Sequence, residues 1–200
     1  MWRRLCGLAV IALVVVIAHA RYEDRYDMDT LPWDLRPVRN FIGMWELQGK
    51  PAGRWRDLPA PDLIDFSINP IPKFGARTVN ITHSYYKPNS KDVARSDYGF
   101  MPIKNATRRD PRVHVAYLTT SSMGYSMMEQ GFVRGPKIIT HLKQFLRRSF
   151  DVGNNGIDLE IREFERQYEQ TDFHHMTMKI RAATAIETEG YTAEYKKVLW

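Results

Sequence analysis

Apolar residues recur at every second position over several stretches of the chain, and this period predicts strands with one buried face. The alternation is clear over residues 64–68 and 79–85, and it continues over 113–117, 138–145 and 164–168. Side chains on a strand point alternately to its two faces, so a period of two gathers the apolar residues of a stretch on one face. We therefore expect half-buried strands over most of the chain.

A different spacing precedes the strands. Leu35, Val38, Phe41 and Ile42 lie mostly three or four residues apart, and Gly43 follows them directly. This spacing is typical of one face of a helix, and glycine is common just after a helix end. The sequence predicts one or two helical turns that end at Gly43.

Turn-forming residues separate the expected strands. The sharpest signal is Asn155-Gly156, which favours a type I′ hairpin because both residues accept a positive φ. A calcium loop starting at Asp151 is the alternative, but its twelfth position, where a Glu is needed, is Arg162. Many short strands joined by turns indicate an all-β antiparallel sandwich or barrel. A closed barrel is favoured because it leaves no unpaired edge.

The composition is that of a folded domain preceded by an export signal. The chain has 200 residues, of which 44% are hydrophobic and 26% charged, so one domain is expected. Arg3 and Arg4 precede an apolar run over 5–17, and Ala18-His19-Ala20 follows as a cleavage site. The run is shorter than the roughly 20 residues of a spanning helix, so residues 1–20 are expected to be a signal peptide. An uncleaved anchor is the alternative.

Export has consequences for the mature chain. Cys6 lies within the expected signal, so no cysteine remains to form a disulfide. Asn80 and Asn105 each begin an acceptor sequence for N-glycosylation. Removing the signal lowers the Lys and Arg count from 29 to 27 against 23 acids, and the net charge from +6 to +4.

We therefore expect a secreted glycoprotein that keeps no membrane span after signal cleavage. Nucleic acid is not expected as a partner of an exported chain with this modest charge. Heparin-like polysaccharide and anionic lipid headgroups stay open as partners of the basic pairs Arg108-Arg109 and Arg147-Arg148. The sequence does not indicate the oligomeric state.

The mature chain divides into an arm and a barrel domain. Residues 21–34 are acidic and aromatic without a period and are expected to form a flexible arm, and residues 35–200 form the barrel. Gly43-Met44-Trp45 has the arrangement that opens lipocalin-like barrels, with Trp45 at the barrel floor. Met176, Met178 and Ile180 share one face of a late strand, as barrel core or as an adaptable apolar pocket wall.

Three short motifs, taken in order, carry a resemblance to a known family. They are Arg36-Pro37 to Trp45 near the start, Asp97-Tyr98-Gly99-Phe100 in the centre, and Ala193-Glu194-Tyr195-Lys196-Lys197-Val198 at the end. Over residues 33–198 the chain resembles the nitrobindin family, which includes the haem-binding domain found behind THAP-type zinc fingers. The sequence is similar to a divergent, secreted member of that family.

The resemblance implies a lipocalin-like antiparallel barrel of about ten strands that holds haem b at its mouth through a His on the last strand. Gly190 stands at the position of that His, and Tyr191 at the position of the following Leu. In the central motif Arg95 replaces a His that the family often has. The implied haem or ligand pocket comprises Gly190, Tyr191, Met176, Met178, Ile180, Arg95 and Trp45. A phenolate ligates haem iron in some proteins, so Tyr191 is the candidate substitute ligand.

Three functions follow from this reading. The first is a secreted barrel that binds a small hydrophobic or haem-like ligand, with the axial His replaced by Gly190. The alternative is a haem protein with a substitute axial ligand that acts on nitric oxide or, as an isomerase, on peroxynitrite. The third is a structural domain with a filled barrel. The sequence lacks a G-x-S-x-G, an H-E-x-x-H and a glycine-rich phosphate loop, so catalysis without haem has little support.

Overall fold

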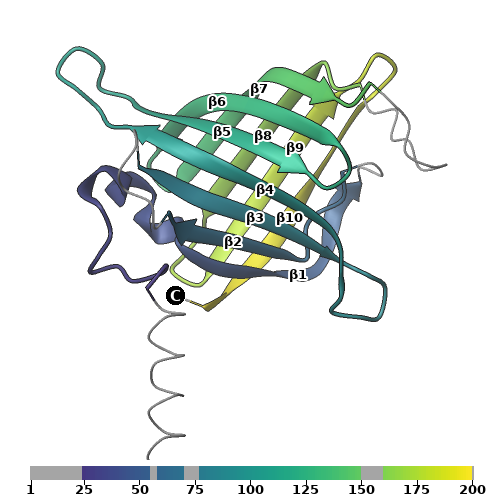
Figure 1. Cartoon of the computed structure of the whole chain (residues 1–200), viewed down its shortest axis with the longest axis horizontal. Coiled ribbons are helices and arrows are strands. Elements are labelled where there is room, and N and C mark those ends of the chain that lie inside the picture. Colours follow the sequence, from purple (N-terminus) through teal and green to yellow (C-terminus); the bar gives the residue numbers. More distant parts are fainter. Residues whose placement is uncertain (1–23, 55–57, 70–76, 150–159, 200) are drawn as a thin grey trace, which may run out of the picture.

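Ten antiparallel strands wrap around one axis and close into a barrel (Figure 1). The computed structural model describes residues 24–54, 58–69, 77–149 and 160–199. The strands are β1 (Gly43–Arg54), β2 (Leu63–Ile68), β3 (Thr78–Tyr86), β4 (Val93–Lys104), β5 (Val113–Ser121), β6 (Tyr125–Arg134), β7 (Lys137–Arg147), β8 (Glu163–Gln170), β9 (His175–Ala183) and β10 (Thr188–Leu199). The expected all-β antiparallel barrel is thereby confirmed.

Each strand pairs with its neighbours in sequence, and β1 also pairs with β10 to complete the ring. In this last ladder Trp45 lies opposite Lys197 and Gln48 opposite Glu194, and the register then shifts before Ala52. Closure gives every strand two partners, so none of the ten described strands has a wholly unpaired edge. A sandwich, the other architecture that the strand pattern allowed, is excluded.

A short helix covers one end of the barrel, which we call the floor; the opposite end is the mouth. The helix is η1 (Trp33–Phe41), of the 3-10 type, and it buries Leu35, Val38 and Phe41. The helical turns expected before Gly43 are therefore confirmed. Trp45 lies beneath η1, is 0% exposed, and donates from Nε1 to the Phe41 carbonyl oxygen at 2.8 Å.

Gly43 is required where η1 gives way to β1. Its φ is +133°, and a Cβ at this position would lie 2.4 Å from the Leu199 carbonyl oxygen and 2.6 Å from Lys197 Cε. Such a φ suits glycine, and such contacts exclude any side chain. The glycine of the Gly43-Met44-Trp45 motif thus allows the first and last strands to meet closely at the floor.

The segment before η1 is held against the floor end of β2. Tyr26 is 2% exposed and donates from its hydroxyl to Asp65 Oδ1 at 2.9 Å, and Arg25 pairs with Asp65 at 3.1 Å. The Arg25 carbonyl accepts a hydrogen bond from the backbone N–H of Ile68 at 2.9 Å. The described part of the expected arm, residues 24–34, therefore makes specific contacts with the barrel.

Some sequence expectations concern segments outside the described residues. These are the signal peptide over residues 1–20, the first three residues of the arm, and the hairpin at Asn155-Gly156. Within the described ranges, no helix has the length and apolar character needed to cross a membrane.

Candidate functional site

Two arginine–carboxylate pairs lie inside the barrel. Arg95 and Asp97 alternate with outward residues on β4, and Arg95 donates from Nε and Nη2 to the two carboxylate oxygens of Asp97 at 3.1 and 2.9 Å. Arg166 on β8 donates in the same way to Glu129 on β6, at 3.3 and 3.0 Å. Glu129 is 0% and Arg166 4% exposed. Buried charges need such partners because leaving water is costly for each ion.

The Arg95–Asp97 pair lies toward the mouth, among hydroxyl groups. Asp97 accepts hydrogen bonds from the hydroxyls of Tyr85 and Ser121, and Arg95 donates to the hydroxyl of Tyr125. The Arg95 guanidinium also lies over the Tyr85 ring, 4.4 Å from its centre. Burial alone would raise the pKa of Asp97, but the hydrogen bonds and charge of Arg95 hold it below its ordinary value.

The Arg166–Glu129 pair lies deeper and includes a histidine. His83 Nε2 lies 2.8 Å from the Tyr168 hydroxyl, and its Nδ1 lies 3.4 Å from Arg166 Nη1. A guanidinium only donates, so Nδ1 accepts and Nε2 carries the proton. Burial and the positive charge of Arg166 lower the pKa of His83 to about 3. His83 is therefore a neutral imidazole at physiological pH.

Two buried hydroxyls on β5 lack hydrogen-bond partners among the described residues. They are Tyr117 Oη and Thr119 Oγ1, on side chains that are 0% and 3% exposed. Burial raises the pKa of Tyr117 well above its ordinary value, and the nearby Thr119 side chain opposes this rise without having the geometry of a hydrogen bond. A buried hydroxyl without a partner costs about 1–3 kcal/mol. The pair therefore offers one place in the interior where a polar atom would be stabilised.

The local sequence accounts for the position of these hydroxyls. Gly99 on β4 lies opposite Thr119, and a Cβ on Gly99 would come within 2.7 Å of Tyr117 Cε2. The missing side chain leaves the Tyr117 ring its place inside the barrel. On the other side Met127 of β6 lies opposite Thr119 and is 4% exposed. The two hydroxyls are therefore beside an apolar, deformable side chain.

The residues predicted for the pocket occupy three places. Met176, Met178 and Ile180 face the interior from β9 and are at most 7% exposed, whereas Trp45 lies at the floor. Tyr191 faces the interior from β10 at the mouth end, and its hydroxyl donates to the Pro59 carbonyl oxygen at 3.3 Å. Arg95, described above, lies at the mouth.

Gly190 does not face the interior. It alternates with inward-facing Tyr191 and lies between Arg54 of β1 and Arg181 of β9. A Cβ at this position would lie 2.4 Å from the Ile180 carbonyl oxygen. Gly190 thus serves the close approach of three strand backbones rather than the interior.

Sequence reasoning did not assign Asp97, Glu129, Arg166 and His83 to the site. Each occupies an inward position of the period-two pattern, where an apolar residue is the norm. A charged or imidazole side chain at such a position was the available signal, because a buried charge requires a partner. The partner of Arg166 could not be named from the sequence, since Glu129 lies on a strand that is not adjacent to it.

The histidines outside the barrel form local pairs. His114 contacts Asp110, His175 contacts Asp172, and His141 lies 3.6 Å from Glu165. Within the described ranges no three His, Cys, Asp or Glu side chains gather in a way that would hold a metal ion.

Comparisons with known proteins bear on the fold alone. No family model matches the chain, and no curated protein matches it. Among solved structures the chain is similar to the crystal structure of Rv2717c from M. tuberculosis, with a TM-score of 0.53 and 14% sequence identity over 84% of this chain and 98% of that chain. The chain therefore has a barrel fold of a kind compatible with binding a ligand.

Proposed function

We propose that the protein binds one small, uncharged and largely apolar molecule inside its barrel, next to Tyr117 and Thr119. The observation that carries this proposal is the pair of buried, unpartnered hydroxyls on β5. A ligand with one polar atom would give both hydroxyls a partner and would offset the cost of burying them. This supports a ligand that combines an apolar body with a single hydrogen-bonding group.

The charges of the interior support an uncharged ligand. Arg95 is neutralised by Asp97, and Arg166 by Glu129, each through two hydrogen bonds. An added anion or cation would leave one charge without a counterion in a buried space, which is unfavourable. An uncharged molecule does not disturb these pairs.

The apolar wall supports a ligand of irregular shape. Met127, Met176 and Met178 face the interior and are almost fully buried, and Ile180 extends the wall toward the mouth. Methionine side chains are unbranched and adapt to neighbouring surfaces, so such a wall accommodates different apolar bodies. Met176, Met178 and Ile180 could serve as barrel core or as a pocket wall, and we propose that they form the pocket wall.

Binding rather than catalysis fits the protonation states of the interior. Burial lowers the pKa of His83 to about 3, and burial raises the pKa of Tyr168 to about 12. General acid–base catalysis is most effective when the pKa of the group lies near the working pH. Neither member of this hydrogen-bonded pair meets that condition near neutral pH.

The residues present do not fit haem, the group that the nitrobindin resemblance implies. Tyr191 is the candidate ligand to iron, but its hydroxyl already donates to the Pro59 carbonyl. Burial raises its pKa above the ordinary value, which disfavours the phenolate that would bind iron. Gly190, at the family's His position, has no ligating atom. We therefore propose no haem-dependent reaction on nitric oxide or peroxynitrite.

The proposal includes a family and a location. The three sequence motifs, their order and the ten-stranded barrel together support a divergent relative of the nitrobindin barrels. The signal-peptide pattern supports secretion. Asn80 lies on the outward side of β3, whereas Asn105 donates from Nδ2 to the Asp34 carbonyl oxygen at 3.1 Å. Both remain proposed glycosylation sites, and a glycan on Asn105 would displace that hydrogen bond.

A fluorescence titration tests the binding site. Purified protein from a secretory eukaryotic host is titrated with N-phenyl-1-naphthylamine, an uncharged apolar probe with one N–H group. We expect saturable binding of one equivalent. Thr119→Leu removes one of the two hydroxyls and puts a larger apolar side chain in its place, so it should weaken binding at least tenfold. Thr120→Leu is the matched control because Thr120 is exposed on the outer face of the same strand.

The outcomes distinguish the proposal from its alternatives. Absence of probe binding, or equal weakening by Thr119→Leu and Thr120→Leu, contradicts an interior site and favours a filled barrel. A parallel titration with haemin tests the haem alternative. A sharp, stoichiometric Soret band that disappears in Tyr191→Phe would show that haem binds through Tyr191. It would contradict the proposal that the residues of the interior do not fit haem.

A further inference from the structure

The net charge of the chain is concentrated on one wall of the barrel. Residues 98–148, which run from β4 to just after β7, contain nine Lys and Arg and two acids. The whole chain has 29 basic and 23 acidic residues, which leaves 20 and 21 outside this segment. One of the two acids, Glu129, is buried inside the barrel, and the other, Asp110, pairs with Arg112. The outer surface of this wall is therefore cationic.

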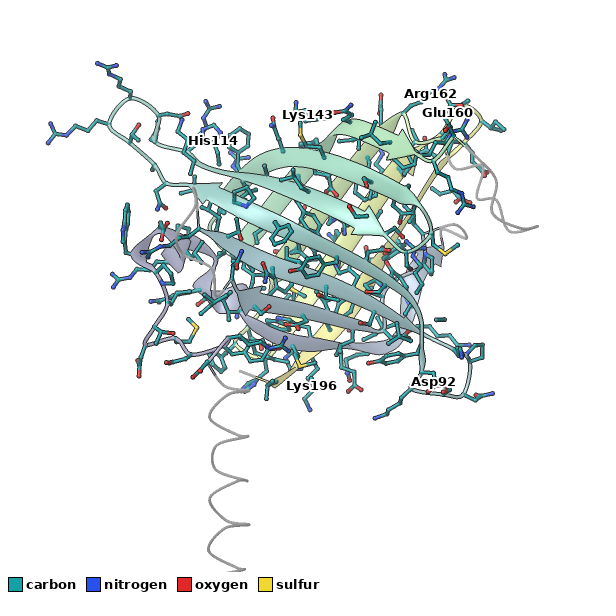
Figure 2. The ribbon with its side chains drawn as sticks, in the orientation of Figure 1. Asp92, His114, Lys143, Glu160, Arg162 and Lys196 are labelled. Atoms are coloured by element: carbon teal, nitrogen blue, oxygen red, sulfur yellow. The ribbon has the colours of Figure 1, made fainter. Side chains whose placement is uncertain are left out.

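A hollow of about 440 Å³ lies on the outer face of the same wall. It crosses four neighbouring strands, β4 to β7. Its residues are Pro102, Ile103, Lys104, His114, Val115, Ala116, Gln130, Gly131, Phe132, His141 and Lys143. Figure 2 shows His114 and Lys143 on the outer side of this wall. Its volume falls within the range of ordinary ligand sites, about 300–1,000 Å³.

The hollow has an apolar centre between two cationic ends. Pro102 and Ala116 are small outward residues on adjacent strands, Gln130 of β6 lies opposite Ala116, and Phe132 lies two residues further along β6. Lys104 lies at the β4 side and Lys143 at the β7 side. Ile139 is the β7 residue across from Lys104, so Lys143 lies three strand spacings away and four residues further along β7, about 20 Å from Lys104 in all.

We propose that this hollow binds an extended acidic peptide segment of a partner protein, with an apolar side chain between two acidic ones. An extended chain advances about 3.3 Å per residue and presents every second side chain on the same face. Acids at the first and seventh positions then span about 20 Å on one face, and an apolar residue at the third position lies between them. These three side chains match Lys104, the apolar centre and Lys143.

The centre of the hollow distinguishes this ligand from a uniformly charged polysaccharide. A sulfated chain carries anionic groups along its whole length, and it requires cations or hydrogen-bond donors throughout its site. Between Lys104 and Lys143 the lining includes no Lys or Arg, and the side chains of Pro102, Ala116 and Phe132 have no donors, so only Gln130, His114 and His141 have side-chain donor groups there. An apolar side chain flanked by acids is the better complement. The site lies outside the barrel, so this inference goes beyond the proposed interior function.

Fluorescence anisotropy with a labelled peptide of sequence S-E-S-F-S-S-S-E-S tests the proposal on the full chain. We expect saturable binding that weakens as salt rises. Lys104→Glu and Lys143→Glu should each raise Kd at least tenfold. Lys196→Glu makes the same change in net charge on β10, away from the hollow (Figure 2), and should change Kd less than twofold.

Further variants and ligands test the apolar centre of the hollow and the class of partner. Ala116→Leu fills the hollow and should abolish binding, and a peptide with Ser in place of Phe should bind at least tenfold more weakly. Equal effects of Lys143→Glu and Lys196→Glu would overturn the proposal, since only net charge would then matter. Absence of peptide binding would also overturn it, and so would a heparin oligosaccharide or phosphatidylserine vesicles binding more tightly through Lys104 and Lys143.

Discussion

The ammonium group of Lys197 lies 4.9 Å from the centre of the Trp45 ring, at the point where β10 closes against β1. The same group donates to the Asn40 carbonyl oxygen at 3.3 Å. A cation over an indole face is attracted by the ring's electron density. The contact joins the first strand, the last strand and the end of η1 at the floor.

Replacing Lys197 should change how stability depends on pH. Burial lowers the pKa of Lys197 to about 8 from its ordinary 10.5, so between these values the unfolded chain holds this proton more tightly than the folded one. The contribution of Lys197 to the free energy of unfolding therefore rises with pH over that range. In Lys197→Met this rise should be absent. Urea unfolding at pH 7, 8, 9 and 10 measures the difference, and parallel profiles would contradict it.

Acid should destabilise the protein through His83. Its pKa is lowered from 6.5 to about 3, so the unfolded chain takes up a proton below pH 6.5 that the folded chain refuses. Stability is therefore lost progressively from pH 6.5 toward pH 3, by a few kcal/mol. His83→Gln should show a shallower loss in urea unfolding over that range. His141→Gln, at an exposed position, is the control and should follow the parent chain.

The pair of Arg166 and Glu129 should behave as one unit. Glu129→Leu leaves a buried guanidinium without its counterion, and we expect a loss of about 3–5 kcal/mol in the free energy of unfolding. The double variant Glu129→Leu with Arg166→Met should recover much of that loss. Lys137→Met, which breaks a partly exposed pair with Glu169, should cost less than about 1 kcal/mol. Additive losses in the double variant would count against coupling.

Gly190→His should not create a haem site. The new Cβ would lie 2.4 Å from the Ile180 carbonyl oxygen, and the side chain would leave from the outer side of β10. We expect a loss of at least about 1–3 kcal/mol from overpacking, seen as a lower Tm, and no Soret band on adding haemin. Thr192→His, two residues along the same face, is the control. A stable Gly190→His protein that binds haem stoichiometrically would contradict the placement of Gly190.

The fold could be predicted because burial alternates strictly along the strands. On β3, for example, the buried residues are Val79, Ile81, His83 and Tyr85, the same positions that the period of two selects. Closure followed from the cost of leaving two edges unpaired. The contacts of Tyr26 with Asp65 could not be predicted, since the segment before η1 has no period and its order depends on a strand distant in sequence.

The site could be predicted only in part. The sequence indicated Arg95, because it stands where the family often has a His. It also indicated Met176 and Met178, because they share one face of a strand. Gly190 was assigned to the pocket only through its match to the family's His, whereas the period of two along β10 puts Tyr191, Ala193 and Tyr195 on the inner face and Gly190 on the outer one. The groups that Arg166 meets were hidden, since pairs across the lumen depend on barrel geometry rather than on spacing.

The ladder between β1 and β10 has a consequence for synthesis. It joins positions 45 and 197, so the ring cannot close until residue 197 has left the ribosome. Until then β1 presents an unpaired edge, and such edges are prone to associate with other chains. Contacts so distant in sequence also slow folding, because loop-closure entropy is lost before they form. We expect this barrel to fold late and slowly, and to depend in the cell on protection of its first strand.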